Sequence, residues 1–272
     1  MKRRKDKALR IGFLGGDARM RIPMEALGQR GYSIASLAPL GIGVATLDTA
    51  ALCAFADVLV FPVPASKDGA TLSGTGIPFS HLPVGAHHAV FGGFFPKDWQ
   101  LKAHRVFDCA LDEPFVLKNA ALTADGGICA ALSATERGFY GCSAAVIGYG
   151  RIARMLIRRL LGFGVPITVY ARRPEALADA ALLGCRAVPL QLDTVISEDI
   201  LFNTVPAPVF DGVRAAHPIS VFDLGGGLPN ALLSPSGDSI PVTSMRGVPG
   251  VFAPRAAGEI ILDALLSFLN SL

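Results

Sequence analysis

The sequence predicts an α/β fold built on parallel sheets with helices packed on both faces. Short apolar runs at residues 11–14, 57–61 and 221–224 have the length of buried strands, and a loop or helical segment follows each run. The clearest unit, residues 144–173, reads as strand, glycine-rich turn, helix and strand. Repeated units of this order are typical of doubly wound, Rossmann-like parallel sheets.

The turn after the predicted strand at residues 144–147 has the spacing Gly-x-Gly-x-x-Ala. Gly148 permits the tight turn, and Gly150 lets backbone N–H groups approach a pyrophosphate at the N-terminus of the next helix. Ala153 takes the third small position, where helix and strand pack closely. Because a strand precedes the motif and a helix follows it, we predict a dinucleotide site rather than only a close-packed turn. The predicted contacts are Gly148, Gly150, Arg151 and Ile152.

The end of the second strand of this unit indicates which cofactor binds. NAD sites usually carry an acidic residue there to hold the ribose 2′-hydroxyl, whereas this strand ends in Arg172 and Arg173. A carboxylate repels a 2′-phosphate, and a guanidinium can bind it through two hydrogen bonds. The sequence therefore favours NADP over NAD; the alternative reading is a solvated strand end.

A further strand is predicted at residues 199–202, and polar residues follow it. Because ligands in parallel sheets bind beyond the carboxyl ends of the strands, we expect Asn203, Thr204 and Pro206 to contact the nicotinamide-side ribose.

The composition is that of a folded chain with a large core. Of the 272 residues, 51% are hydrophobic and 17% are charged, which excludes a disordered chain. The formal net charge of +3 is too small to indicate nucleic-acid binding. We interpret the basic residues 2–10 as a solvated tail, because the apolar run after them is too short for a signal peptide. We expect no segment to span a membrane, and a cytoplasmic location.

Cysteines and histidines show no metal-ligand spacing. The five cysteines are scattered without Cys-x-x-Cys pairs, which indicates reduced, buried thiols rather than disulfides or a zinc site. His81, His87, His88 and His104 lie in or beside predicted loops, where solvated or capping side chains are expected. We predict no metal site.

A long helix is expected to connect two domains. Residues 119–135 are rich in alanine, with Thr123 as a candidate N-cap and Asp125 in the first turn. We assign residues 1–120 to an N-terminal domain, 121–140 to the connecting helix and 141–255 to the dinucleotide-binding domain.

Near the end of the chain, residues 247–255 are predicted to form a loop that leads into an amphipathic helix at 256–269. The apolar side of this helix suggests at least a dimer.

Five segments resemble one family, in the same order and over most of the chain. They are Gly-Gly-Asp-Ala-Arg at 15–19, Pro-Val-Pro-Ala-Ser-Lys-Asp-Gly at 62–69, Thr-Ala-Asp-Gly-Gly at 123–127, Val-Ile-Gly-Tyr-Gly-Arg-Ile at 146–152 and Gly-Val-Pro-Gly-Val-Phe-Ala-Pro-Arg-Ala-Ala-Gly at 247–258. The family is that of the A subunit of dipicolinate synthase from spore-forming bacteria. The sequence departs from it at Asp125, where the family tends to have Glu, and near Val251, where the family often has Lys. It also departs at 225–229, where the family usually has a serine and a Pro-Gly-Gly turn.

The resemblance implies two Rossmann-like domains with a cleft between them, the final helix, 256–272, returning to the N-terminal domain. The implied activity is the oxidation of dihydrodipicolinate, or its hydrated precursor, to dipicolinate in a branch of the lysine (diaminopimelate) pathway. The implied setting is the mother cell of a sporulating bacterium. The implied partner is the flavoprotein-like B subunit of dipicolinate synthase.

A substrate with two carboxylates calls for arginines, hydroxyls and helix N-termini. The expected substrate contacts are Arg19, Ser66, Thr123, Arg246 and Arg255, and the expected proton acceptors are Asp17 and Asp125; each could instead have a structural role. Two alternatives stay open. One is an NADP-dependent dehydrogenase or reductase of another small 2-hydroxy or imino acid, and the other is a nucleotide-binding scaffold that needs a partner.

Overall fold

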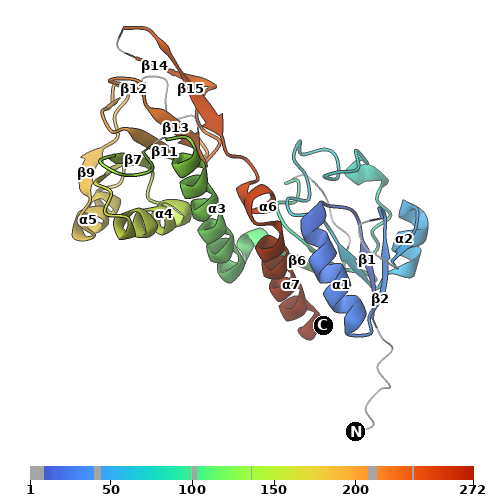
Figure 1. Cartoon of the computed structure of the whole chain (residues 1–272). Helices are drawn as coiled ribbons and strands as arrows, with labels where there is room; N and C mark the ends of the chain where they lie inside the picture. Colours follow the sequence, from blue (N-terminus) through green and yellow to red (C-terminus); the bar gives the residue numbers. More distant parts are fainter. Residues whose placement is uncertain are drawn as a thin grey trace. The chain divides into compact units, whose positions relative to one another are not determined.

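The computed structural model describes residues 9–39, 44–97, 99, 103–135, 137–207, 213–234 and 236–272. The chain divides into two compact units (Figure 1). Unit 1 comprises Met1–Val116 and Pro254–Leu272, and unit 2 comprises Leu117–Ala253. The basic residues of the N-terminal tail up to Lys7 lie outside the described residues.

Unit 1 contains, within the described residues, a six-stranded sheet in the order β3-β2-β1-β4-β5-β6. All its strand pairs are parallel. The order reverses between β1 and β4, which is the point where open α/β sheets bind ligands. The strands are β1 (Arg10–Phe13), β2 (Ser33–Ser36), β3 (Ala45–Thr46), β4 (Val58–Val60), β5 (Ala89–Gly92) and β6 (Arg105–Asp108).

Helices cover both faces of this sheet. Successive residues of a strand point to opposite faces, so neighbouring residues of β4 pack against different helices. Val58 and Val60 face α1 (Arg21–Gln29) and α7 (Pro254–Asn270), which lie side by side. Leu59 faces α2 (Thr49–Phe55) on the other side. The apolar side of α7 is therefore buried within unit 1, and it does not supply the exposed dimer surface expected from the sequence.

The described part of unit 2 contains a nine-stranded sheet in the order β10-β12-β14-β15-β13-β11-β7-β8-β9. The strands from β15 to β9 are parallel to one another, and β14 joins β15 in antiparallel fashion. The strands are β7 (Ala144–Ile147), β8 (Ile167–Ala171), β9 (Arg186–Pro189), β10 (Val195–Ile196), β11 (Ile200–Asn203), β12 (Arg214–Ala215), β13 (Ser220–Asp223), β14 (Ala231–Leu233) and β15 (Ser239–Ser244). The sequence predicts β7, β8, β11 and β13, whereas β9 and the β14–β15 hairpin were not predicted.

The helices α3 (Glu113–Ser133), α4 (Arg151–Gly162) and α5 (Pro174–Leu182) contribute to one core cluster of unit 2. The predicted α/β fold class with two Rossmann-like parallel sheets is confirmed. The predicted cleft between the domains stays a prediction.

The connecting helix α3 differs from the prediction at its start. It begins at Glu113 rather than at residue 119, and the Asp112 carboxylate accepts a hydrogen bond from the Phe115 N–H at 3.0 Å. Thr123 therefore lies in the helix interior and is not its N-cap. Its hydroxyl donates to the Asn119 carbonyl one turn earlier, at 2.9 Å.

Helix α3 is relevant to the expectation that no segment spans a membrane. By length and mean hydropathy, 1.2, it could cross a membrane, and 44% of the relevant window is buried inside the structure. Ala124, Ile128 and Ala131 pack in the core of unit 2. Packing against a sheet accounts for the apolar composition, because a core helix needs apolar residues as a membrane helix does.

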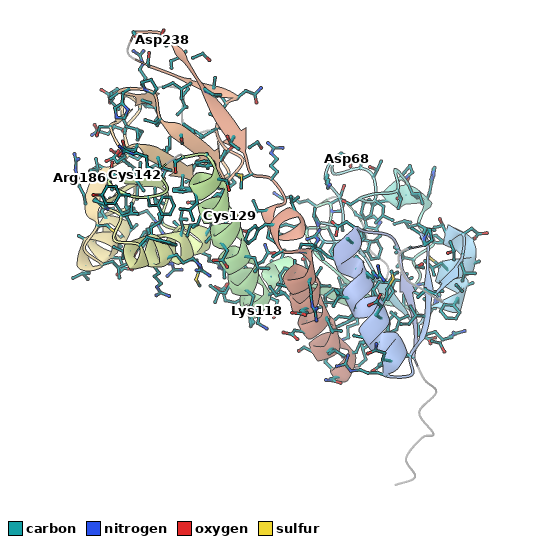
Figure 2. All side chains as sticks on the ribbon, in the orientation of Figure 1. Asp68, Lys118, Cys129, Cys142, Arg186 and Asp238 are labelled. Carbon is teal, nitrogen blue, oxygen red and sulfur yellow. The ribbon has the colours of Figure 1, made fainter. Side chains whose placement is uncertain are left out.

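Three smaller expectations were wrong. Residues 248–252 form a short helix, α6 (Val248–Phe252), inside the predicted loop. Cys129 is exposed on α3, unlike the buried Cys142 (Figure 2). His88 is fully buried, and its ring links the loop at Gly85 to helix α2: Nδ1 accepts from the Gly85 N–H at 2.9 Å, and Nε2 lies 2.8 Å from the Cys53 carbonyl.

Candidate functional site

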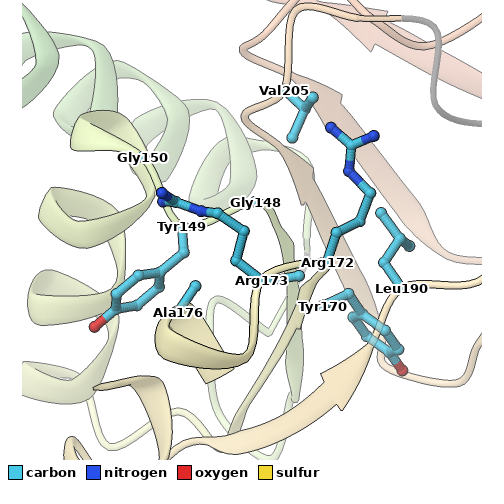
Figure 3. A pocket seen from close by; sticks show the side chains of 10 residues that line it. Gly148, Tyr149, Gly150, Tyr170, Arg172, Arg173, Ala176, Leu190 and Val205 are labelled. Atoms are coloured by element: carbon cyan, nitrogen blue, oxygen red, sulfur yellow. The ribbon is translucent and has the colours of Figure 1, made fainter. Parts of the chain in front are cut away.

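A pocket lies in unit 2 beyond the carboxyl ends of β7 and β8, and we call it the nucleotide pocket. Its cavity volume is about 170 Å³. It includes the glycine-rich turn after β7, the end of β8 and one residue after β11, and β7 and β11 flank the point where the strand order reverses. Figure 3 shows its lining: Gly148, Tyr149, Gly150, Tyr170, Ala171, Arg172, Arg173, Ala176, Leu190 and Val205.

The two glycines of the turn have different geometries. Gly148 has φ +94°, which favours glycine, and a Cβ there would lie 2.7 Å from both Thr204 Oγ1 and Val205 Cγ2. Gly150 is the N-cap of α4 with φ −82°, and a Cβ there would meet nothing within 4 Å. Gly150 therefore leaves open space in front of the first N–H groups of α4, where a pyrophosphate fits.

The remaining predicted contacts of this turn lie at the start of α4. Arg151 is exposed, and Ile152 is half-buried and packs against the core of unit 2. Ala153 is fully buried, as expected for a position where the helix approaches the sheet.

Arg172 and Arg173 both line the nucleotide pocket and are exposed. Their side chains extend in different directions from the end of β8 (Figure 3). Within the described part of the chain, no carboxylate forms an ion pair with either guanidinium. Both are therefore available to an anionic ligand.

Tyr170 also lines the pocket, and its hydroxyl bonds to another residue of unit 2. The hydroxyl donates to the buried Glu198 carboxylate at 3.1 Å. Burial, with the nearby Glu198 charge, raises the pKa of Tyr170 to about 12. The phenol therefore stays protonated at neutral pH.

At the end of β11, the side chains of Asn203 and Thr204 form hydrogen bonds within unit 2. Asn203 is fully buried, and its amide N–H donates to Asp223 Oδ1 at 2.7 Å and to the Val205 carbonyl at 3.0 Å. The Thr204 hydroxyl donates to the Ile147 carbonyl at 2.8 Å. Val205, rather than Asn203, Thr204 or Pro206, lines the pocket. The three predicted ribose contacts stay predictions.

Two predicted site residues of α3 are engaged in contacts within unit 2. Asp125 forms an ion pair with Arg159 of α4, whose Nε and Nη2 both donate to the carboxylate. Thr123 is 6% exposed and bonded to its own helix. Their proposed roles as proton acceptor and substrate contact stay predictions.

The two arginines near the end of unit 2 and the start of α7 have different surroundings. Arg246 lines a second cavity at the ends of β13 and β15. Arg255 is 85% exposed on α7 and pairs with Glu259 one turn later, at 3.1 Å.

In unit 1, Asp17 and Arg19 bind each other after β1. The Arg19 Nε and Nη2 atoms each lie 2.8 Å from an Asp17 carboxylate oxygen, and Nη2 also donates to the Val63 carbonyl at 2.6 Å. Burial acts to raise the pKa of Asp17, but the hydrogen bonds and charge of Arg19 prevail and leave it lowered. A lowered pKa makes Asp17 a weaker proton acceptor.

Ser66, the remaining predicted substrate contact, closes its own loop after β4. Its hydroxyl accepts from the Gly69 N–H at 2.9 Å and donates to the Thr71 carbonyl at 2.8 Å. Across the described residues, no group of three or more His, Cys, Asp or Glu side chains could hold a metal ion.

Comparisons with known proteins agree with this geometry. Residues 120–209 match the family described as D-isomer specific 2-hydroxyacid dehydrogenase, NAD binding domain. The A subunit of dipicolinate synthase from Bacillus subtilis (strain 168) is 27% identical over an alignment of 167 positions that covers 58% of this chain and 55% of that protein. The match thus spans about half the length of the curated relative.

Solved structures share the fold over nearly the whole chain. The A subunit of dipicolinate synthase from Bacillus halodurans aligns with a TM-score of 0.68 at 21% identity, over 96% of this chain and 98% of that one. The corresponding protein of Bacillus subtilis gives 0.68 at 20% identity, over 97% of each. A transhydrogenase from Sinorhizobium meliloti gives 0.56 at 15% identity, over 96% and 92%.

The chain resembles the A subunit of dipicolinate synthase. The resemblance predicted from five sequence segments is therefore confirmed. The matched NAD-binding domain contains the nucleotide pocket, and it indicates a nicotinamide dinucleotide cofactor and a dehydrogenase-type domain.

Sequence reasoning missed several lining residues of the pocket in this dipicolinate synthase-like chain. Leu190 follows β9, a strand that was not predicted, and Val205 stands between Thr204 and Pro206, which were predicted as contacts while Val205 was not. Their positions in the sequence could have indicated them, because both residues closely follow parallel strands, and ligands bind beyond the carboxyl ends of such strands.

Proposed function

We propose that this chain is an NADP-dependent oxidoreductase that acts on dihydrodipicolinate or its hydrated precursor, as its resemblance to the A subunit of dipicolinate synthase implies. The observation that carries the cofactor choice is the pair of exposed guanidinium groups of Arg172 and Arg173 in the nucleotide pocket. Among the described residues that line the pocket, none is acidic, so the lining offers no carboxylate to hold the ribose 2′-hydroxyl or to repel a 2′-phosphate. NAD is the alternative cofactor.

The chemistry suits a site that mainly holds and orients its substrate. Dihydrodipicolinate is a cyclic imine with two carboxylates, and losing a hydride and a proton makes its ring aromatic. Bound NADP⁺ supplies the hydride acceptor. The protein then has to bind the carboxylates and hold the ring in place. Arg19, Ser66, Thr123, Arg246 and Arg255 are the proposed contacts, and Asp17 and Asp125 the proposed proton acceptors.

The curated relative is named as one subunit of its enzyme, which supports a second subunit in the assembly. We therefore include the B subunit of dipicolinate synthase in the proposal, with self-association as a further possibility. The proposed location is the cytoplasm of the mother cell in a sporulating bacterium, on a branch of the lysine (diaminopimelate) pathway.

One observation favours a different substrate. The matched domain, residues 120–209, is described for 2-hydroxyacid dehydrogenases, which supports another small 2-hydroxy or imino acid. The turn at 225–227 consists of three glycines where the related family usually has other residues. This keeps open a nucleotide-binding scaffold that is active only with its partner.

The test is dipicolinate formation followed by ultraviolet absorbance. Purified chain is mixed with NADP⁺ or NAD⁺ and freshly made dihydrodipicolinate, with and without the B subunit. Product with NADP⁺ supports the proposal. Tight NADP⁺ binding without product, even when the B subunit is present, rejects it; a panel of 2-hydroxy and imino acids then separates another dehydrogenase from a scaffold.

A further inference from the structure

A second cavity lies at the same edge of the unit 2 sheet as the nucleotide pocket, and we call it the Arg246 cavity. Its volume is about 360 Å³. Asp223 and Ser244 end the neighbouring parallel strands β13 and β15, so the cavity lies beyond the carboxyl ends of strands, where α/β sheets bind ligands. The lining residues are Asp223, Leu228, Pro229, Asn230, Val242, Ser244 and Arg246.

The exposed polar lining of this cavity can donate hydrogen bonds. Arg246, Ser244 and Asn230 have no side-chain hydrogen-bond or ion-pair partner among the residues that the structure describes. A guanidinium, a hydroxyl and an amide are suitable donors to the two oxygens of one carboxylate.

The acidic residue among the described lining residues, Asp223, is directed into the protein. It is 3% exposed, and its carboxylate accepts from the Asn203 amide at 2.7 Å, the Gly226 N–H at 2.8 Å and the Leu228 N–H at 3.1 Å. Three donors satisfy this carboxylate without Arg246. The charge exposed in the cavity is therefore that of Arg246.

Two glycines of α3 lie in close contact with Leu224 and Val248, which precede the glycine turn and follow Arg246. A Cβ on Gly126 would lie 2.1 Å from Val248 Cγ1, and a Cβ on Gly127 would lie 3.0 Å from Leu224 Cδ1. Leu224 leads into the glycine turn, and Val248 follows Arg246 by two residues. Leu224 and Val248 therefore pack closely on α3, and the Met245 N–H, next to Arg246, donates to the Asp223 carbonyl at 2.9 Å.

The Arg246 cavity is separated from the nucleotide pocket by one turn of chain. Cβ atoms on Gly225 and Gly227 would lie 2.5 Å and 2.4 Å from Val205 backbone atoms, and Val205 also lines the nucleotide pocket. Between them, Gly226 has φ +80°, and its Cβ position is 3.7 Å from Arg246 Nε. A ligand held by Arg246 thus lies next to the glycine turn that packs on Val205, a lining residue of the nucleotide pocket.

We infer that the Arg246 cavity binds a carboxylate of the substrate, a small planar ring acid, and directs its ring toward the nucleotide pocket. The inference rests on the proposed function for the identity of the acid. Arg246 is the anchoring cation, and Ser244 and Asn230 are additional donors. The other proposed substrate arginines, Arg19 and Arg255, are already bound to carboxylates of their own unit.

The experiment measures binding of pyridine-2,6-dicarboxylate to the full chain in saturating NADP⁺ by isothermal titration calorimetry. We expect Arg246→Gln to weaken binding about tenfold to a hundredfold, because it removes charged hydrogen bonds. Arg246→Lys should lose less, since it keeps the charge but not the planar fork. The matched control is Arg214→Gln, exposed on β12 outside the cavity, which should bind as the wild type does.

NADP⁺ affinity, measured for each variant, checks that unit 2 is folded. Equal dicarboxylate affinity in wild type and Arg246→Gln overturns the inference, as does the absence of wild-type binding. Failure of the proposed function gives a different result: no product forms from dihydrodipicolinate, yet the stable acid still binds through Arg246. Conversely, turnover with an unchanged KM in Arg246→Gln keeps the proposed reaction and rejects this inference together with the proposed Arg246 contact.

Discussion

Both units reverse their strand order beside the first strand of the sheet, β1 in unit 1 and β7 in unit 2. The loops that follow these two strands differ in structure. In unit 2 the missing Cβ of Gly150 leaves open space, whereas in unit 1 a Cβ on Gly16 would lie 2.4 Å from Met20 Cγ. Met20 is 2% exposed, and Asp17 and Arg19 bind each other beside it. The same strand–turn–helix order therefore leaves a cavity in front of a helix N-terminus in unit 2, and forms a packed turn with an internal ion pair in unit 1. Whether a glycine faces protein or open space distinguishes the two.

Alanine substitutions at these glycines test the comparison most directly, and Gly148→Ala should have the largest effect. A side chain at φ +94° with contacts of 2.7 Å should destabilise unit 2 by about 2 kcal/mol or more. Gly150→Ala should lower stability much less than Gly148→Ala, by the small preference of an N-cap for glycine over alanine. It should weaken NADP⁺ binding about tenfold or more, because its methyl enters the open space where the charged pyrophosphate bonds form. Gly16→Ala should lower stability without changing NADP⁺ affinity. Thermal unfolding and NADP⁺ titration measure both effects; a Gly150→Ala variant with normal affinity would contradict the assignment of this cavity to the pyrophosphate.

Arg172→Asp should change the cofactor preference of the nucleotide pocket. Losing a guanidinium and adding a repulsive carboxylate should weaken NADP⁺ binding about tenfold to a hundredfold, while NAD⁺ binding changes little or improves. Fluorescence titrations with both cofactors give the ratio of the NADP⁺ and NAD⁺ dissociation constants. Arg186→Asp is the control, because Arg186 is exposed on β9 and does not line the pocket. An equal loss for both cofactors would argue against a 2′-phosphate contact.

Each unit also contains a helix glycine that packs against its loop region, and the two can be compared. A Cβ on Gly258 of α7 would lie 2.6 Å from the Arg19 carbonyl oxygen, and one on Gly126 of α3 would lie 2.1 Å from a Val248 methyl. Because backbone yields less than a side chain, Gly258→Ala should destabilise its unit by more than Gly126→Ala, each by about 1–3 kcal/mol. Urea unfolding of both variants measures the difference; Gly162→Ala, at a helical glycine of α4 with no neighbour within 4 Å, is the control without overpacking.

The smallest expected effect concerns the Asp17–Arg19 pair. Since the pKa of Asp17 is lowered in the folded protein, its contribution to stability is present above its unfolded pKa of about 4 and is lost as pH falls through the folded value. Asp17→Asn should therefore cost at most about 1 kcal/mol at pH 7, because the carboxylate is half exposed, and less at pH 3. Unfolding midpoints at pH 3, 5 and 7 test this; a loss that does not depend on pH would contradict the ion-pair account.

Most of the fold could be predicted from sequence because its signals are local. Apolar runs of strand length, the Gly148–Gly150 turn and the amphipathic α4 all depend on neighbours within a few residues. The start of α3 was misplaced because the Asp112 cap gives a weaker signal than the alanine-rich stretch after it. The β14–β15 hairpin was missed because its short strands resemble loops.

The sequence by itself determined the α/β class, the dinucleotide turn and the two arginines that favour NADP. Only the tertiary structure decided which polar residues are free to bind ligands. Asn203, Asp125 and Asp17, which the sequence predicts as site residues, each have a partner that is distant in the chain or depends on a folded turn. Arg246 is left without such a partner among the described residues. The physical reason is that a polar side chain binds the nearest complementary group, and that neighbour is set by how the strands and helices pack rather than by sequence spacing.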